Sequence, residues 1–169
     1  PYNELGAAAA AYNADEKELC RLDEIYSAAK TPFEIRSGSE KVTRRFFKIC
    51  NNGREIFTGL YKSLTEQGIC KGHQCIAYGL YMRDNGIELS EGLAVYGYSI
   101  CSAIVTNCVK LVPLSQLAGQ KILGESFELI SSAAEKALFT DINDIGISGA
   151  GFDLRAMQHE RLYSRQYMS

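Results

Sequence analysis

The chain has 169 residues, of which 46% are apolar and 22% are charged, and its formal net charge is −2. This balance is typical of one folded domain and excludes an intrinsically disordered chain. It also excludes the strong positive field with which many proteins bind nucleic acid nonspecifically. We therefore expect a single domain over residues 1–169, with no nucleic-acid partner.

Apolar residues recur at helical spacing along most of the chain. The chain contains three prolines and lacks long alternating runs of Val, Ile and Thr, which also favours helices over strands. The predicted helices cover residues 7–26, 33–49, 55–66, 73–83, 90–111, 115–138 and 153–165. We therefore predict an all-α, single-domain bundle of about six to seven helices, with strands absent or trivial.

Residues 92–109 contain no charged side chain, and this stretch is close to the length that spans a bilayer. However, it carries polar groups such as Tyr96, Ser102 and Asn107, and it has few Leu or Phe residues. That polar content favours a helix buried inside a bundle or a dimer over a membrane span. We expect no membrane partner.

The cysteines lie mostly among apolar neighbours, at Cys20, Cys50, Cys70, Cys75, Cys101 and Cys108. A chain of this size does not need disulfides to fold, so we interpret them as free thiols in a reducing cytoplasm. Cys70, His73 and Cys75 place three soft metal ligands close together, but a zinc site needs four ligands. We predict no cofactor and no metal site, and we keep a small Cys/His metal-binding protein as an alternative.

The joint between two of the predicted helices is unusual, because Pro113 ends one helix and Ser115 can cap the next. Gly119 then falls in the first turns of the second helix, where glycine is less stable than alanine. Gln116 and Gln120 lie on one face beside this glycine. Two interpretations stay open: an ordinary joint between helices, or a bare notch that lets the backbone of a partner approach closely.

Motifs for catalysis are weak in this chain. Residues 146–151 superficially resemble a phosphate-binding loop, but they lack the Gly-Lys-Ser/Thr ending and follow no predicted strand. Neither His73 nor His159 is accompanied by a serine in a nucleophile elbow. We predict that the chain is not an enzyme. As an alternative we keep an α-helical enzyme, with an active site that is completed by residues outside this chain.

The C-terminal residues 159–169 carry two arginines, two tyrosines and a methionine, which are frequent in protein interfaces. A chain terminus normally frays, so this composition indicates a tail that docks onto a partner. Arg165 would offer a planar fork of donors, and Tyr167 a large contact area. We predict a C-terminal helix and partner-docking tail over residues 153–169.

Two specific motifs occur together in this sequence. The first runs Val112-Pro113-Leu114-Ser115-Gln116 and continues as Gly119-Gln120-Lys121-Ile122-Leu123, and the second is His159-Glu160 … Leu162-Tyr163-Ser164-Arg165 … Ser169. Pro32-x-Glu34-x-Arg36 and His73 … Tyr78-Gly79 … Gly86-Ile87 accompany them. This combination resembles the family of the urease accessory protein UreF. The resemblance covers most of the chain from residue 20 onward, and the chain looks like the C-terminal part, roughly two-thirds, of such a protein.

The resemblance implies an all-α homodimer that is not itself an enzyme and that acts as a cytoplasmic chaperone of protein maturation. It implies a bridge between the accessory protein UreD, also called UreH, and the nickel-binding GTPase UreG, in the complex that inserts nickel into apo-urease. The matching positions imply partner contacts at Lys110, Gln116, Gly119, Gln120, His159, Glu160, Arg165, Tyr167 and Ser169. An unrelated helical adaptor that binds some other protein stays an alternative.

Overall fold

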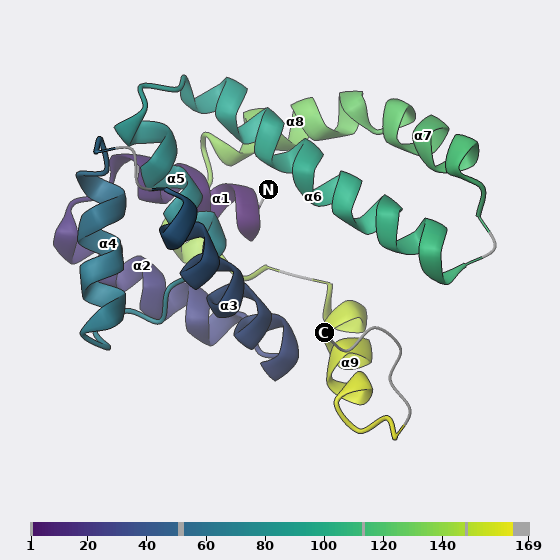
Figure 1. The fold of residues 1–169 in the computed structure, drawn as a ribbon, viewed down its shortest axis with the longest axis horizontal. Helices are drawn as coiled ribbons and strands as arrows, with labels where there is room; N and C mark the ends of the chain where they lie inside the picture. The colour runs from purple at the N-terminus through teal and green to yellow at the C-terminus, as the bar shows by residue number, and fades with distance from the viewer. Residues whose placement is uncertain (1, 51–52, 113, 148, 164–169) are drawn as a thin grey trace.

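The structure is a computed structural model that describes residues 2–50, 53–112, 114–147 and 149–163. Within those residues the chain forms α-helices and a short 3-10 helix, and no strand is present, which confirms the predicted all-α fold (Figure 1). The elements are α1 (Glu4–Asn13), α2 (Glu16–Ala29), α3 (Phe33–Ile49), α4 (Phe57–Glu66), α5 (Gln74–Asp84), α6 (Leu89–Leu111), α7 (Gln116–Glu125), α8 (Phe127–Ala137), η1 (Ile142–Asp144) and α9 (Ala150–His159).

The core of the fold is the pair formed by α1 and α5. Ala7, Ala8 and Ala11 of α1 are fully buried, so small side chains bring its backbone close to its neighbours. On α5, a Cβ atom added to Gly79 would lie 2.2 Å from the carbonyl oxygen of Ala8, which means that only glycine allows this approach. The helices α2, α6 and α8 pack on α1, and α3, α4 and α6 pack on α5.

Two of the predicted helices are each divided in the structure. The first is divided because Asp15 begins α2 with a capping box, in which its side chain accepts from the backbone N–H of Glu18 at 2.8 Å. The predicted helix after the proline joint is divided into α7 and α8 at Ser126, whose hydroxyl donates to the carbonyl of Ile122 at 2.8 Å. Such a bond bends a helix. The described residues therefore hold more helices than the sequence predicts.

A buried carboxylate fastens the loop between α4 and α5 to α2. Asp23 of α2 is 2% exposed, and its oxygens accept from the backbone N–H groups of Lys71 at 2.7 Å and Gly72 at 3.1 Å. The Tyr61 hydroxyl also donates to Asp23, and it accepts in turn from the backbone N–H of His73 at 2.8 Å. Bonds to a charged acceptor are among the stronger hydrogen bonds in proteins, so this network holds three elements in register.

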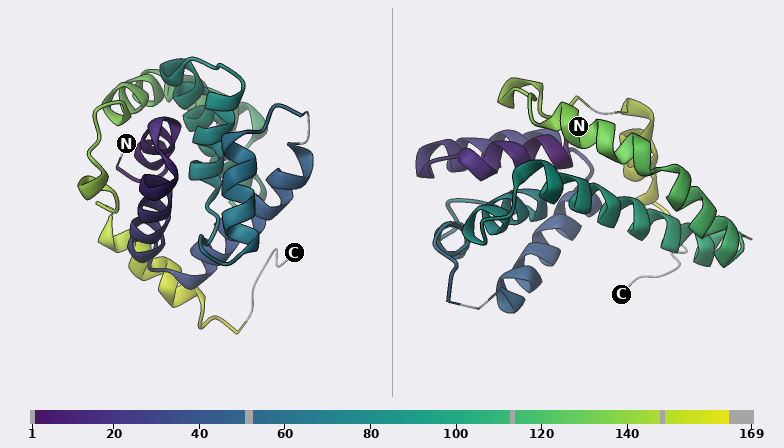
Figure 2. Two further views of the ribbon diagram at one scale, coloured as in Figure 1. Left: turned by 90° about the vertical axis from the view of Figure 1, so that its left-hand side faces the viewer. Right: turned by 90° about the horizontal axis from the view of Figure 1, so that it is seen from above.

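The second half of α6 leaves the core and packs against α7, and together these segments form an arm, residues 101–125. Figure 2 shows the arm extending beyond the other helices. The buried residues of α6 all lie in its first half, at Gly92, Leu93, Tyr96 and Gly97. The prediction of a helix buried inside the bundle is therefore wrong for the second half of α6, whereas burial of that half in a dimer stays a prediction.

Among the described residues, α6 is the helix long and apolar enough to cross a membrane by length and composition alone. Within its most apolar stretch, 22% of the residues are buried in the structure. A single helix of this kind is weak evidence for a membrane span, because helices of other proteins have the same composition. The expectation that the chain has no membrane partner stays a prediction.

Candidate partner-docking site

The start of α3 is held by the side chain of Glu160 from the end of α9 and by Arg36 of α3 itself. Pro32 is its N-cap residue and supplies no side-chain hydrogen bond, so the first N–H groups of the helix need other acceptors. Glu160, at the end of α9, accepts from the backbone N–H of Phe33 at 2.9 Å and places a carboxylate near the N-terminus of α3. Arg36 reaches back and donates to the carbonyl of Lys30 at 3.1 Å, just after α2.

A second contact joins the same two elements. His159 Nδ1 lies 2.7 Å from the Glu34 carboxylate, across 125 residues of sequence. The Pro32-x-Glu34-x-Arg36 and His159-Glu160 motifs, which the sequence presents as separate features, therefore meet in space. The base of the predicted docking tail is thus fixed to α3 by one hydrogen bond to backbone and one contact between side chains.

The bounds of α9 differ from the predicted ones. The helix begins at Ala150, with Gly149 as its N-cap, so Asp153 lies inside its first turn and does not cap it. A carboxylate in the first turn still stabilises a helix, because it faces the partial positive charge of the N-terminus. The helix ends at His159 instead of continuing to Arg165, and the side chain of Glu160 turns to α3.

Large apolar side chains on α9 and at the start of α3 are exposed to solvent. Their exposed fractions are 60% for Phe33, 69% for Phe152, 60% for Leu154 and 38% for Met157. Exposed apolar residues that gather beside ordered polar contacts are typical of surfaces that bind other proteins. A cleft of about 270 Å³ lies between the start of α1, the end of α2, the start of α3 and α9, and Phe152 is one of its lining residues.

Helix α7, which follows the proline joint, has an ordinary capped start. Ser115 caps α7, as predicted, by accepting from the backbone N–H of Ala118 at 3.1 Å. Gly119 is buried against α6, and a Cβ atom added to it would lie 2.8 Å from Val109 and 3.2 Å from Val105. The interpretation of an open notch at Gly119 is therefore wrong, because the α6 helix of the same chain fills that space. The predicted role of Gly119 in partner binding stays a prediction.

The predicted site residues fall into two separate groups. Lys110, Gln116 and Gln120 are exposed near the end of the arm, and Gly119 is buried between its two helices. His159 and Glu160 lie at the junction of α9 with α3, on different elements from the arm. The remaining predicted residues, Arg165, Tyr167 and Ser169, lie outside the described residues. The sequence gives no sign that Phe33 and Glu34 contact the tail, because no periodicity relates positions so far apart.

The potential metal ligands of the α4–α5 loop are not assembled as a site. Cys70 Sγ lies 3.9 Å from Cys20 Sγ, and His73 Nε2 lies 2.7 Å from the Ser27 hydroxyl. Burial lowers the pKa of His73 to about 4, so its ring is neutral, and its Nδ1 atom is buried with no hydrogen-bond partner. Cys75 is fully buried on α5. In the part of the chain that the structure describes, no group of three or more His, Cys, Asp or Glu side chains is placed to hold a metal ion.

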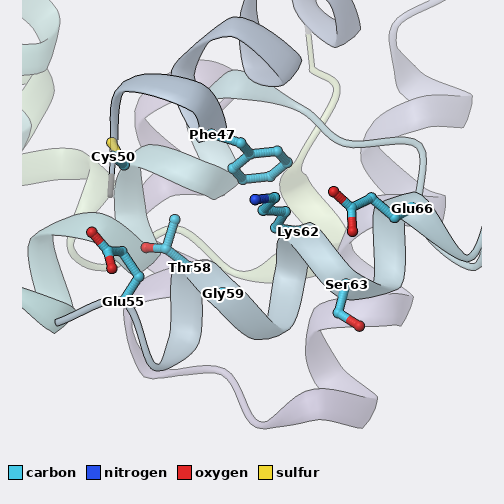
Figure 3. Close-up of a pocket in the computed structure, with 8 residues that line it drawn as sticks. All are labelled: Phe47, Cys50, Glu55, Thr58, Gly59, Lys62, Ser63 and Glu66. Atoms are coloured by element: carbon cyan, nitrogen blue, oxygen red, sulfur yellow. The ribbon is translucent and has the colours of Figure 1, made fainter. Parts of the chain in front are cut away.

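A further hollow of about 330 Å³ lies between the end of α3 and α4 (Figure 3). Its lining residues are Phe47, Cys50, Glu55, Thr58, Gly59, Lys62, Ser63 and Glu66. Lys62 extends toward the ring of Phe47, and the two acidic side chains lie on either side of it. Because charges of both signs line the hollow, it selects neither an anion nor a cation, and we assign it no ligand.

Comparison with known proteins points to one family. A sequence model of the UreF family matches residues 2–126, which extends from the start of α1 to Ser126. The urease accessory protein UreF of Actinobacillus pleuropneumoniae serotype 5b is 34% identical over 159 residues, covering 93% of this chain and 70% of that protein. The protein of the same name from Paenarthrobacter aurescens is 31% identical over 152 residues, covering 88% of this chain and 67% of that protein.

A third relative, the urease accessory protein UreF of Streptococcus thermophilus strain LMD-9, is 28% identical over 148 residues. That alignment covers 87% of this chain and 62% of the relative. The family match ends before α9, whereas the alignment with the Actinobacillus protein covers most of the chain.

Proposed function

The chain belongs to the UreF family of urease accessory proteins, and on that premise we propose that it is a bridging protein without catalytic activity of its own. Its role is to join the accessory protein UreD, also called UreH, to the GTPase UreG in the complex that inserts nickel into apo-urease. It works in the cytoplasm, and nickel is the cargo of the assembly and not a resident cofactor of this chain.

The observation that carries this proposal is the fixed base of the tail. Glu160 and His159 tie the end of α9 to Phe33 and Glu34 of α3, directly before the segment that contains Arg165. A docking segment loses less conformational freedom on binding when the residue before it is already held in place than when that residue is mobile. The planar guanidinium group of Arg165 can then donate several hydrogen bonds to carboxylates or carbonyls of UreD/UreH.

The exposed apolar surface of the arm supports association with a second copy of the chain. Ile104 and Leu111 of α6 are 57% and 55% exposed, on a helix whose central part carries no charge. Leu117 of α7 is 82% exposed. We include a homodimer in the proposal because burial of these side chains against a second copy would remove apolar surface from water.

The proposal is tested by capture of purified UreD/UreH on the immobilised chain, followed by addition of UreG. Substitution Arg165→Ala is expected to weaken capture of UreD/UreH at least about tenfold, as is common for a central arginine in an interface. Removal of residues 160–169 is expected to abolish capture, because it also removes the Glu160 contact with α3. Both variants are expected to retain the helical circular dichroism spectrum of the unmodified chain.

Arg155→Ala is the matched control. Arg155 is exposed on α9, outside the C-terminal motif, and its guanidinium donates to the side chain of Gln158 at 3.2 Å. Its loss removes an arginine from the same helix and is expected to leave capture unchanged. Equal capture by the unmodified chain and by Arg165→Ala would overturn the assigned role of the tail. Absence of capture by the unmodified chain would favour an unrelated helical adaptor.

A further inference from the structure

Two cysteines from distant parts of the sequence lie side by side. Cys20 is on α2, Cys70 is in the loop between α4 and α5, and their sulfur atoms are 3.9 Å apart. All six cysteines lie within the described residues and are free thiols there. A disulfide bond is about 2.05 Å long, so bond formation needs the two sulfurs to close by roughly 2 Å.

The loop that carries Cys70 is held against α2 from both sides. Before Cys70, the loop is tied to α4, because the N–H groups of Ile69 and Cys70 donate to the carbonyl of Leu64 at 3.0 and 3.2 Å. After Cys70, the N–H groups of the next two residues donate to Asp23. Asp23 lies on the same face of α2 as Cys20, because residues three apart in a helix are neighbours. The contact between the sulfurs therefore follows from the hydrogen bonds that fix the backbone.

The two thiols differ in accessibility. Cys20 is half-buried, whereas Cys70 is 2% exposed. Burial, together with the nearby carboxylate of Asp23 and the thiol of Cys20, raises the pKa of Cys70 far above its ordinary range. Because Cys20 is the more accessible thiol, it meets an oxidant first, and Cys70 is the one that completes the bond.

We propose that Cys20 and Cys70 form a reversible disulfide when the chain meets a low-molecular-weight disulfide such as glutathione disulfide. Cys20 releases its proton to water, and its sulfur attacks one sulfur of glutathione disulfide, which forms a mixed disulfide and releases one glutathione thiolate. That thiolate takes up the proton of Cys70, whose sulfur attacks Cys20 and releases the second glutathione as a thiolate, which takes a proton from water. Two protein thiols are oxidised and one glutathione disulfide is reduced to two glutathione molecules.

The bond would link α2 to the α4–α5 loop and close a covalent loop from residue 20 to residue 70, which contains α3 and α4. A closed loop of this length restricts the unfolded chain, so we expect the Tm of the oxidised chain to rise by about 10 °C. The bond adds to the Asp23 contacts that already hold the same loop, so the native fold needs little rearrangement to accept it. This inference does not depend on the proposed function.

The test uses the full chain treated with excess glutathione disulfide and then unfolded and alkylated without reduction. Peptide mapping by mass spectrometry is expected to find the peptides of Cys20 and Cys70 joined, with the loss of two hydrogens. Dithiothreitol is expected to separate them and to reverse the rise in Tm. Cys20→Ser is expected to remove both the linked peptides and the rise in Tm, while Cys70 stays alkylated.

The matched control is the double variant Cys101→Ser and Cys108→Ser, whose cysteines lie on α6 away from the pair. It is expected to form the same linked peptides as the unmodified chain. A stable mixed disulfide between Cys20 and glutathione, with Cys70 still free, would overturn the proposal, as would linkage of either cysteine to another partner. Because the peptide map of the unmodified chain decides this, the test does not depend on how well Cys20→Ser folds.

Discussion

The α1–α5 core and the arm of residues 101–125 use small and apolar residues in opposite ways. In the core, Ala8 and Gly79 bring two helix backbones into direct contact, and both residues are buried. In the arm, Ile104 and Leu117 are 57% and 82% exposed, and the chain itself offers them little cover. The difference teaches that the core fixes the fold of the isolated chain, whereas the apolar surface of the arm is available for contact with another protein.

The strongest test of this comparison is the substitution Gly79→Ala in the core. The added Cβ atom would lie 2.2 Å from the Ala8 carbonyl oxygen and 3.0 Å from its carbonyl carbon, so the backbones of α1 and α5 must separate. We expect the free energy of unfolding to fall by about 3 kcal/mol, at the upper end of the usual cost of overpacking. Chemical denaturation followed by circular dichroism measures the change.

Gly124→Ala in α7 is the matched control for that substitution. A Cβ atom added to Gly124 meets nothing within 4 Å, and the residue lies inside a helix with ordinary helical backbone. Because alanine has the higher helix propensity, we expect this variant to be more stable by roughly 0.5–1 kcal/mol. Equal effects of the two substitutions would contradict the distinction between core and arm.

The buried His73 makes the stability of the core depend on pH. Its pKa is lowered to about 4 in the folded chain, chiefly by burial, from an ordinary value near 6.5. Between these two values the unfolded chain binds a proton that the folded chain does not, so stability falls as the pH falls. We expect a loss of about 2 kcal/mol between roughly pH 7 and pH 5, measured by denaturation at each pH.

His73→Gln isolates this effect, because glutamine does not titrate in that range. The difference in stability between the unmodified chain and His73→Gln is expected to shrink or change sign as the pH falls from about 7 to about 5. A pH-independent difference would show that protonation of His73 in the unfolded chain contributes nothing. No comparable loss is expected from the arm, whose exposed face carries no histidine.

The smallest expected effect on stability comes from the arm. Leu117→Ser exchanges an apolar side chain that is 82% exposed, so little buried surface is lost. We expect the free energy of unfolding to change by less than about 0.5 kcal/mol, as for most surface substitutions. Dilute samples are needed in denaturation, because self-association would add to the apparent stability. A loss of several kcal/mol from this variant would mean that the arm is part of the folding core after all.

Local signals in the sequence were sufficient for several features of the fold. The run of Ala7 to Ala11 and the helical spacing of apolar residues predict the helices, and the Ser115 cap lies where it was expected. The capping box of Asp15 and Glu18 was also readable, yet the prediction joined the two helices that it separates. These features are predictable because each depends on residues within about one turn of each other.

The candidate site was less predictable than the helices. The residue patterns mark the tail and the joint as motifs, but they do not indicate which residues surround them. Gly119 was open to two interpretations until Val105 and Val109 of the preceding helix proved to fill the space beside it. Likewise, α6 looks like a buried helix from its lack of charge, although its second half is exposed. Composition describes what a helix can bury, and not whether a neighbour is there to cover it.

Residue patterns along the chain are sufficient to establish the helical class of this protein, its family and the residue types of its terminal segment. The contacts of Glu160 with Phe33, of His159 with Glu34 and of Cys70 with Cys20 arise only when the helices pack. Helix formation depends on neighbours along the chain, whereas these contacts depend on how the packed helices place distant residues. No local propensity encodes that placement, because it results from the close packing of the whole core.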